Sequence, residues 1–124
     1  MKGKFTFTMV LFIIFMAVTS CDKRLAKQMA GFYDCRVDYH YFDILPTTID
    51  STYYVTIEVE QEEQHVLVLG RKIHVDSLRG GNEYKEGGAH RKFTLQIIND
   101  GLIMKTSGGG QGAIASHSYV GTKQ

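Results

Sequence analysis

The chain has 124 residues, with 14 Lys and Arg against 13 Asp and Glu, and it contains two cysteines, Cys21 and Cys35. Two of the lysines, Lys2 and Lys4, lie in the first 20 residues, so residues 21–124 carry 12 basic and 13 acidic side chains, a formal charge of −1. This balance excludes the basic stripe that nucleic-acid-binding proteins need, and the length suits one small domain.

The first 20 residues have the three-part layout of a secretory signal peptide. Lys2 and Lys4 form a basic start, Phe5–Val18 is apolar apart from two threonines, and two small residues end the segment. The apolar stretch is too short for a transmembrane helix, which needs about 20 residues. We therefore expect residues 1–20 to be removed during export.

The end of this segment, Val18-Thr19-Ser20-Cys21, resembles the bacterial lipobox. The resemblance implies that Cys21 is acylated and becomes the first residue of the mature protein. More than one acyl chain is needed for stable anchoring. The protein would then be held in the bacterial cell envelope, on the inner or the outer membrane and facing the periplasm. The alternatives are an uncleaved anchor and an ordinary signal peptide with an incidental cysteine.

Acylation of Cys21 leaves Cys35 as the one free thiol, so no disulfide within the chain is expected. Cys35 falls on the apolar side of an alternating stretch, which predicts burial as a small apolar side chain. An intermolecular bridge and a reactive role are the alternatives.

The remaining pattern predicts a short helix followed by strands. Leu25 and Met29 lie four residues apart, with Gly31 at a stop position, so residues 22–30 are expected to be helical. Residues 33–41 and 52–60 alternate between apolar and polar side chains, which is typical of strands with one face in water.

Shorter alternating stretches predict six more strands, separated by turn residues, with Asp100-Gly101 as the clearest hairpin signal. They lie at residues 65–69, 72–75, 83–86, 91–98, 102–105 and 113–120. The predicted fold is all-β, an antiparallel eight-stranded up-and-down meander over residues 31–124. We expect it to close into a barrel because closure removes exposed edges, and a lipidated N-terminus and helix at residues 21–30 precede it.

One longer connection, Phe42–Ser51, contains the single proline, Pro46. It is expected to cross one mouth of the barrel, either as a lid that carries binding residues or as a plain connector.

The short helix, the tripeptide Gly31-Phe32-Tyr33 at the start of the first strand and the seven further strands together resemble the calycin superfamily of lipocalin-like barrels. Tyr33 stands where lipocalins have tryptophan. The resemblance implies the architecture and a barrel that binds a small apolar or amphipathic ligand.

Several aromatic side chains fall on the predicted inward face and are the candidate ligand-binding residues: Tyr33, Tyr39, Tyr41, Tyr53 and Phe93. An eight-stranded barrel is just wide enough to be filled by side chains or to hold one small molecule. Five rings argue against a deep cavity and favour a shallow aromatic mouth. The alternative is that these rings are core.

The chain carries no recognisable catalytic or metal-binding motif. Its five histidines are scattered, without the spacing or paired cysteines of zinc sites. The histidine in Ser116-His117-Ser118 points to the strand face opposite its serine neighbours, which defeats activation of either serine. The pairs Asp38 with His40 and His74 with Asp76 are expected on the wet face. We predict neither an enzyme nor a cofactor.

These observations leave several functions. The first is a non-enzymatic, lipid-anchored protein that binds a small apolar or amphipathic ligand or an envelope partner. A second is inhibition of lysozyme-type enzymes, because Ser77–Tyr84 is similar to the inhibitory loop of some periplasmic lipoproteins, with Arg79, Asn82 and Tyr84 as the partner-binding residues. A purely structural role is the third.

Overall fold

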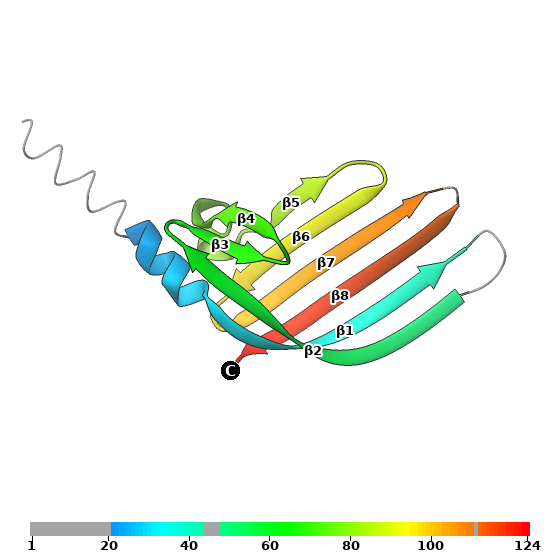
Figure 1. Ribbon diagram of the computed structural model, residues 1–124, viewed down its shortest axis with the longest axis horizontal. Coiled ribbons are helices and arrows are strands. Elements are labelled where there is room, and N and C mark those ends of the chain that lie inside the picture. Colours follow the sequence, from blue (N-terminus) through cyan, green and yellow to red (C-terminus); the bar gives the residue numbers. More distant parts are fainter. Residues whose placement is uncertain (1–20, 44–47, 111) are drawn as a thin grey trace, which may run out of the picture.

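The computed structural model describes residues 21–43, 48–110 and 112–124, so the predicted signal peptide and Pro46 lie outside it. A helix spans residues 21–29, and eight strands follow (Figure 1). The strands are β1 (Gly31–Phe42), β2 (Thr48–Glu62), β3 (His65–Val68), β4 (Arg71–His74), β5 (Tyr84–Gly87), β6 (Arg91–Ile98), β7 (Gly101–Gly110) and β8 (Ala113–Lys123). In the described part of the chain, no helix combines the length and apolar character needed to cross a membrane.

All strands belong to one antiparallel sheet with the order β4-β3-β2-β1-β8-β7-β6-β5. The predicted fold class is confirmed: two four-stranded meanders are joined by the pairing of the first strand with the last. Within the described residues no ladder joins β4 to β5, which are connected by two 3-10 turns, η1 (Val75–Ser77) and η2 (Arg79–Gly81). The sheet therefore curls into a half-barrel that is open on this side (Figure 1).

The prediction of a long connection over Phe42–Ser51 is wrong. β1 continues to Phe42 and β2 begins at Thr48, and these two residues are partners in the ladder. The ladder extends this far because side chains also bind across it, as in the contact between His40 Nδ1 and a carboxylate oxygen of Asp50. The rest of the predicted connection, residues 44–47, lies outside the described residues.

The β6–β7 hairpin lies where it was predicted, but its turn is shifted by one residue. Ile98 pairs with Gly101, so the turn residues are Asn99 and Asp100. Asn99 has φ 55°, a left-handed conformation that asparagine adopts more readily than most residues. Asn99 therefore has the role that was expected of Gly101.

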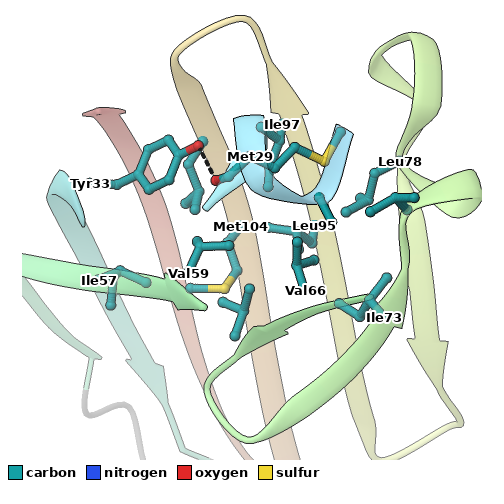
Figure 2. Packing of buried hydrophobic residues seen from close by; sticks show 14 of the residues in the cluster. Met29, Tyr33, Ile57, Val59, Val66, Ile73, Leu78, Leu95, Ile97 and Met104 are labelled. Carbon is teal, nitrogen blue, oxygen red and sulfur yellow. Dashed lines mark hydrogen bonds between the residues drawn. The ribbon is translucent and has the colours of Figure 1, made fainter. Parts of the chain in front are cut away.

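The core lies at the end of the half-barrel that the helix covers. Ala26 and Met29 of the helix are buried against inward residues of the sheet, and the Tyr33 hydroxyl donates a 2.7 Å hydrogen bond to the Met29 carbonyl (Figure 2). The buried cluster also contains Ile57, Val59, Val66, Val68, Ile73, Val75, Leu78, Leu95, Ile97, Leu102 and Met104. Beyond this cluster no helix of the described residues lies over the inward face of the long strands, and a concave surface begins there (Figure 1).

Candidate ligand-binding groove

The uncovered part of the inward face carries a row of aromatic side chains on β1 and β8. Tyr39 and His117 are partners across the ladder, with ring centroids 4.8 Å apart. The His117 ring stacks on Tyr119 at 6.2 Å, with an angle of 22° between the planes. All three side chains are half-buried, although the inward residues of the same two strands that lie nearer the helix are fully buried. Ring faces are thus exposed on a concave surface.

A pocket of about 560 Å³ lies beside this row, between β4, β5, β6, β7 and β8. Its inward lining residues include Arg71, Glu86, Phe93, Thr106 and His117. Their positions follow from the register, because Phe93 pairs with Glu86 on one side and with Thr106 on the other. We define the groove as this pocket together with the rings of Tyr39 and Tyr119.

Arg71 spans the open side of the half-barrel. Its guanidinium carbon lies 4.2 Å from the centre of the Phe93 ring, and its Nε lies 3.6 Å from Glu86 Oε2. A guanidinium over an aromatic face is attracted by the ring quadrupole. Arg71 of β4 is thus held over β5 and β6, where no backbone ladder among the described residues joins the two edges.

The groove has a basic rim on an apolar floor. Arg71 and Arg91 contribute two positive charges, and Glu86 contributes one negative charge. Glu86 also accepts a 3.0 Å hydrogen bond from the Tyr84 hydroxyl, which raises the pKa of Tyr84, and burial adds to this effect. Glu86 has two partners already, whereas no ion pair involves Arg91 among the described residues, so the rim favours an anion.

The predicted ligand-binding residues fall into two groups. Tyr33 and Phe93 are fully buried, Tyr33 in the core under the helix and Phe93 beneath Arg71 as the groove floor. Tyr39 and Tyr41 are half-buried and Tyr53 is 38% exposed, all on the uncovered part of the inward face. The negative charge of Asp43 raises the pKa of Tyr41.

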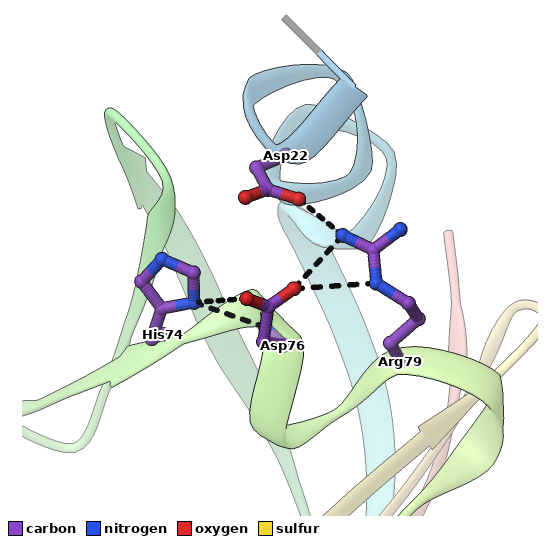
Figure 3. A network of polar contacts seen from close by, with 4 residues as sticks. All are labelled: Asp22, His74, Asp76 and Arg79. Carbon is purple, nitrogen blue, oxygen red and sulfur yellow. Dashed lines mark hydrogen bonds and ion pairs between the residues drawn. The ribbon is translucent and has the colours of Figure 1, made fainter. Parts of the chain in front are cut away.

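The loop residues Arg79, Asn82 and Tyr84 do not form one exposed surface. Arg79 donates hydrogen bonds to Asp76, of 2.9 and 3.3 Å, and binds the carboxylate of Asp22 (Figure 3). Tyr84 packs its ring against Phe93 at 6.2 Å, on the groove side. Asn82 is exposed and ends the η2 turn.

The polar network around Arg79 fixes the start of the helix to the sheet. Asp22 is 7% exposed, and His74 accepts a 3.1 Å hydrogen bond from the backbone N–H of Asp76 (Figure 3). Asp22, His74 and Asp76 are close enough to share a metal ion. However, the guanidinium of Arg79 already supplies a positive charge there, and His74 Nδ1 already accepts the hydrogen bond from Asp76. We interpret the network as structural.

Cys21 is exposed at the start of the helix, whereas Cys35 is buried. Burial raises the pKa of the Cys35 thiol, and the charge of Asp34 raises it further. A thiol of this kind is a poor nucleophile because little thiolate is present at neutral pH.

Several groove residues were missed by the sequence analysis. Glu86 and Arg91 lie on the neighbouring strands β5 and β6, but Arg71 lies on β4 at the opposite edge of the sheet and meets them only because the sheet curls. His117 and Tyr119 could have been found, because they alternate on β8 in the way that the tyrosines do on β1.

Comparison of the chain with protein-family models, with curated proteins and with solved structures finds no match in any of the three.

Proposed function

We propose that this protein is a lipid-anchored bacterial envelope protein that binds a small amphipathic ligand with an anionic group in the groove, without catalysing a reaction. The observation that carries the proposal is the pocket of about 560 Å³ that Arg71 and Arg91 line, in which Arg71 lies over the ring of Phe93. Ligand sites are typically concave and mostly apolar, with a few polar groups that fix orientation.

The chemistry of the lining supports an amphipathic ligand. Phe93, Tyr39 and Tyr119 offer ring faces to an apolar tail, and Arg71 offers a planar donor pair to a carboxylate or phosphate. His117 and Thr106 add polar atoms at the boundary between the two. A purely apolar ligand would leave the two arginines without a new partner on binding.

Cys21 and the groove lie toward different ends of the molecule. The helix that begins at Cys21 covers one end of the half-barrel, and the strands run from there toward the uncovered end (Figure 1). The buried Asp22 holds this helix to Arg79, so an acyl chain on Cys21 would be attached to a fixed point. A membrane at that end leaves the groove accessible to water.

Two photoreactive probes with the same alkyl chain, one a carboxylate and one an alcohol, test the ligand class. The full chain, in the envelope of a bacterium that processes lipoproteins, is expected to be labelled by the carboxylate on peptides from β6 and β8. Arg71→Ala should reduce this labelling about tenfold, the size expected for losing one charge-assisted contact. Lys105→Ala removes an exposed cation from the outer face and serves as the control. Equal labelling by both probes, or no effect of Arg71→Ala, would refute an anion site.

A separate experiment tests the anchor. Growth with a labelled fatty acid is expected to label the wild-type chain and not Cys21→Ser, whereas Cys35→Ser should retain the label. Mass analysis should place the first residue of the mature chain at Cys21. An unmodified Cys21 in the mature protein would remove the anchor and leave the groove proposal standing.

We do not extend the proposal to inhibition of lysozyme-type enzymes. Arg79 and Tyr84, which would have to meet an enzyme cleft, are engaged with Asp22, Asp76 and Glu86.

A further inference from the structure

The longest strand of the sheet has an unpaired edge. β2 spans Thr48–Glu62 and pairs with β1 along its whole length from Thr48 to Val59. On its other side β3 pairs only with Glu60, Gln61 and Glu62. β3 is short because the chain reverses at Leu69 and Gly70, which both have positive φ and form the tight turn into β4. Residues 48–59 therefore present free backbone groups along this edge.

Nothing else in the described part of the chain covers the edge. None of the backbone hydrogen bonds between loops, turns and strands involves residues 48–59. The polar side chains of this stretch bind in the opposite direction, toward β1: Thr52 to Asp38 at 2.9 Å, Thr56 to Asp34 at 3.3 Å and Asp50 to His40.

The edge has few of the features that keep sheet edges apart. Lysine, proline and inward-pointing charges are the usual protections. The stretch Thr48–Val59 contains no lysine, proline or glycine, and its two acids point to the outer face with Tyr54. Its inward positions carry Ile49, which is 49% exposed, and Tyr53. Exposed β-branched and aromatic residues on an unprotected edge favour the addition of a strand.

From this edge we infer that the protein forms a symmetric dimer in which β2 pairs antiparallel with β2 of a second copy. A two-fold axis perpendicular to the sheet keeps the inward face of one copy beside the inward face of the other, as an isologous contact requires. With the axis at Tyr53, residue i faces residue 106 − i of the second copy, so inward residues face only inward residues.

This register is favoured over the registers shifted by one axis position because it avoids contacts between like charges and pairs more residues. With the axis at Tyr53, Tyr53 faces itself, Ile49 faces Ile57, and the acids Asp50 and Glu58 face Thr56 and Thr48. Moving the axis to Tyr54 would place Asp50 opposite Glu58 twice, and like charges directly opposite each other destabilise a sheet. Moving it to Thr52 would leave Ile57 and Glu58 without partners among the described residues of β2.

Disulfide formation at single introduced cysteines tests the register in the full, processed chain in its membrane. Tyr53→Cys places two thiols opposite each other across the axis, within reach of a disulfide, whereas Thr56→Cys faces Asp50 of the second copy. Mild oxidation is expected to give roughly tenfold more dimer for Tyr53→Cys than for Thr56→Cys, with the bond located by mass analysis. The wild type, in which Cys35 is buried, provides the background.

Sedimentation of the protein in mild detergent gives an independent measurement. The wild type and Tyr53→Phe should have the mass of two chains, and Tyr53→Lys, which places two like charges on the axis, should have the mass of one. The inference would be overturned by a monomeric wild type at every concentration, by equal disulfide yields at positions 53 and 56, or by attachment of the thiol in Tyr53→Cys to a different protein. None of these outcomes bears on the pocket of the groove, which lies on β4 to β8.

Discussion

Gly121 and Cys35 are partners across β8 and β1, and they are packed so closely that only glycine fits. A methyl group on Gly121 would lie 2.3 Å from the Cys35 sulfur and 2.9 Å from the Asp34 carbonyl oxygen. We expect Gly121→Ala to lower the free energy of unfolding by about 1–3 kcal/mol, the usual cost of overpacking. Chemical denaturation followed by circular dichroism measures the loss.

The cause of this loss can be separated from a general effect of replacing glycine. Cys35→Ala in the Gly121→Ala background removes the sulfur and should recover part of the stability, which gives a favourable coupling in a double-mutant cycle. Gly88→Ala, where no atom lies within 4 Å of the new methyl group, should change the stability little. Additive effects of Gly121→Ala and Cys35→Ala would show that the new methyl group clashes with the backbone of Asp34 and not with the Cys35 thiol.

Leu69 is a second residue whose conformation conflicts with its side chain. It has φ 49° in the two-residue turn before Gly70, and it is 48% exposed. Left-handed backbone costs most residues roughly 1–2 kcal/mol, and Asn-Gly is the preferred pair for such a turn. Leu69→Asn should therefore raise the free energy of unfolding by about 0.5–1 kcal/mol, measured as a shift in the denaturation midpoint. Ile103→Asn, at an exposed strand position, is the control and should lower the free energy of unfolding. A loss of stability for Leu69→Asn would contradict the view that the left-handed backbone of Leu69 is strained.

At the scale of elements, the helix depends on a few contacts with the rest of the chain. Arg79 joins the buried carboxylate of Asp22 to Asp76 of η1, and Ala26 and Met29 fill the end of the core. Removing one partner of a buried charge leaves the other uncompensated, which is costly even where the pair itself contributes little. Arg79 is therefore more important for the position of the helix than its exposure indicates.

We expect Arg79→Ala to accelerate amide hydrogen exchange of residues 22–29 several-fold while the exchange of β6 and β7 stays the same. Lys23→Ala is the matched control, because its 3.0 Å ion pair with Glu63 is exposed on both sides and such pairs contribute little. Unchanged exchange in Arg79→Ala would mean that Ala26 and Met29 hold the helix without the ion pairs.

The elements differ in how far they can be predicted from the sequence. The strands follow from alternation, which is local: β1 buries Tyr33, Cys35 and Val37 and exposes the residues between them. The opening between β4 and β5 is not local, because it depends on how far the sheet curls. The same distinction applies to the groove. Its tyrosines lie on one predicted face, whereas Arg71 and Glu86 are brought together by curvature that no short pattern encodes.

At the scale of the whole molecule, burial is concentrated at the end that the helix covers. Leu102 and Met104 near that end are fully buried, whereas further along the same strand Thr106 and Gly108 are only half-buried. Regions with few buried apolar contacts open at lower free energy than the global unfolding transition. Stability and binding are therefore expected to reside at different ends of the half-barrel, with the groove in the part that contributes less to the core.

Two truncations on neighbouring strands test this division. Leu102→Ala removes a side chain that is 0% exposed, and it should lower the free energy of unfolding by about 2–5 kcal/mol. Ile114→Ala, at a position that is 54% exposed near the uncovered end, should lower it by less than about 0.5 kcal/mol. In hydrogen exchange, the amides of residues 113–117 should exchange through local opening and be insensitive to Leu102→Ala, while the amides of residues 95–97 should follow the global stability. If both segments lose protection equally in Leu102→Ala, the half-barrel unfolds as one unit and the uncovered end is as firmly held as the core.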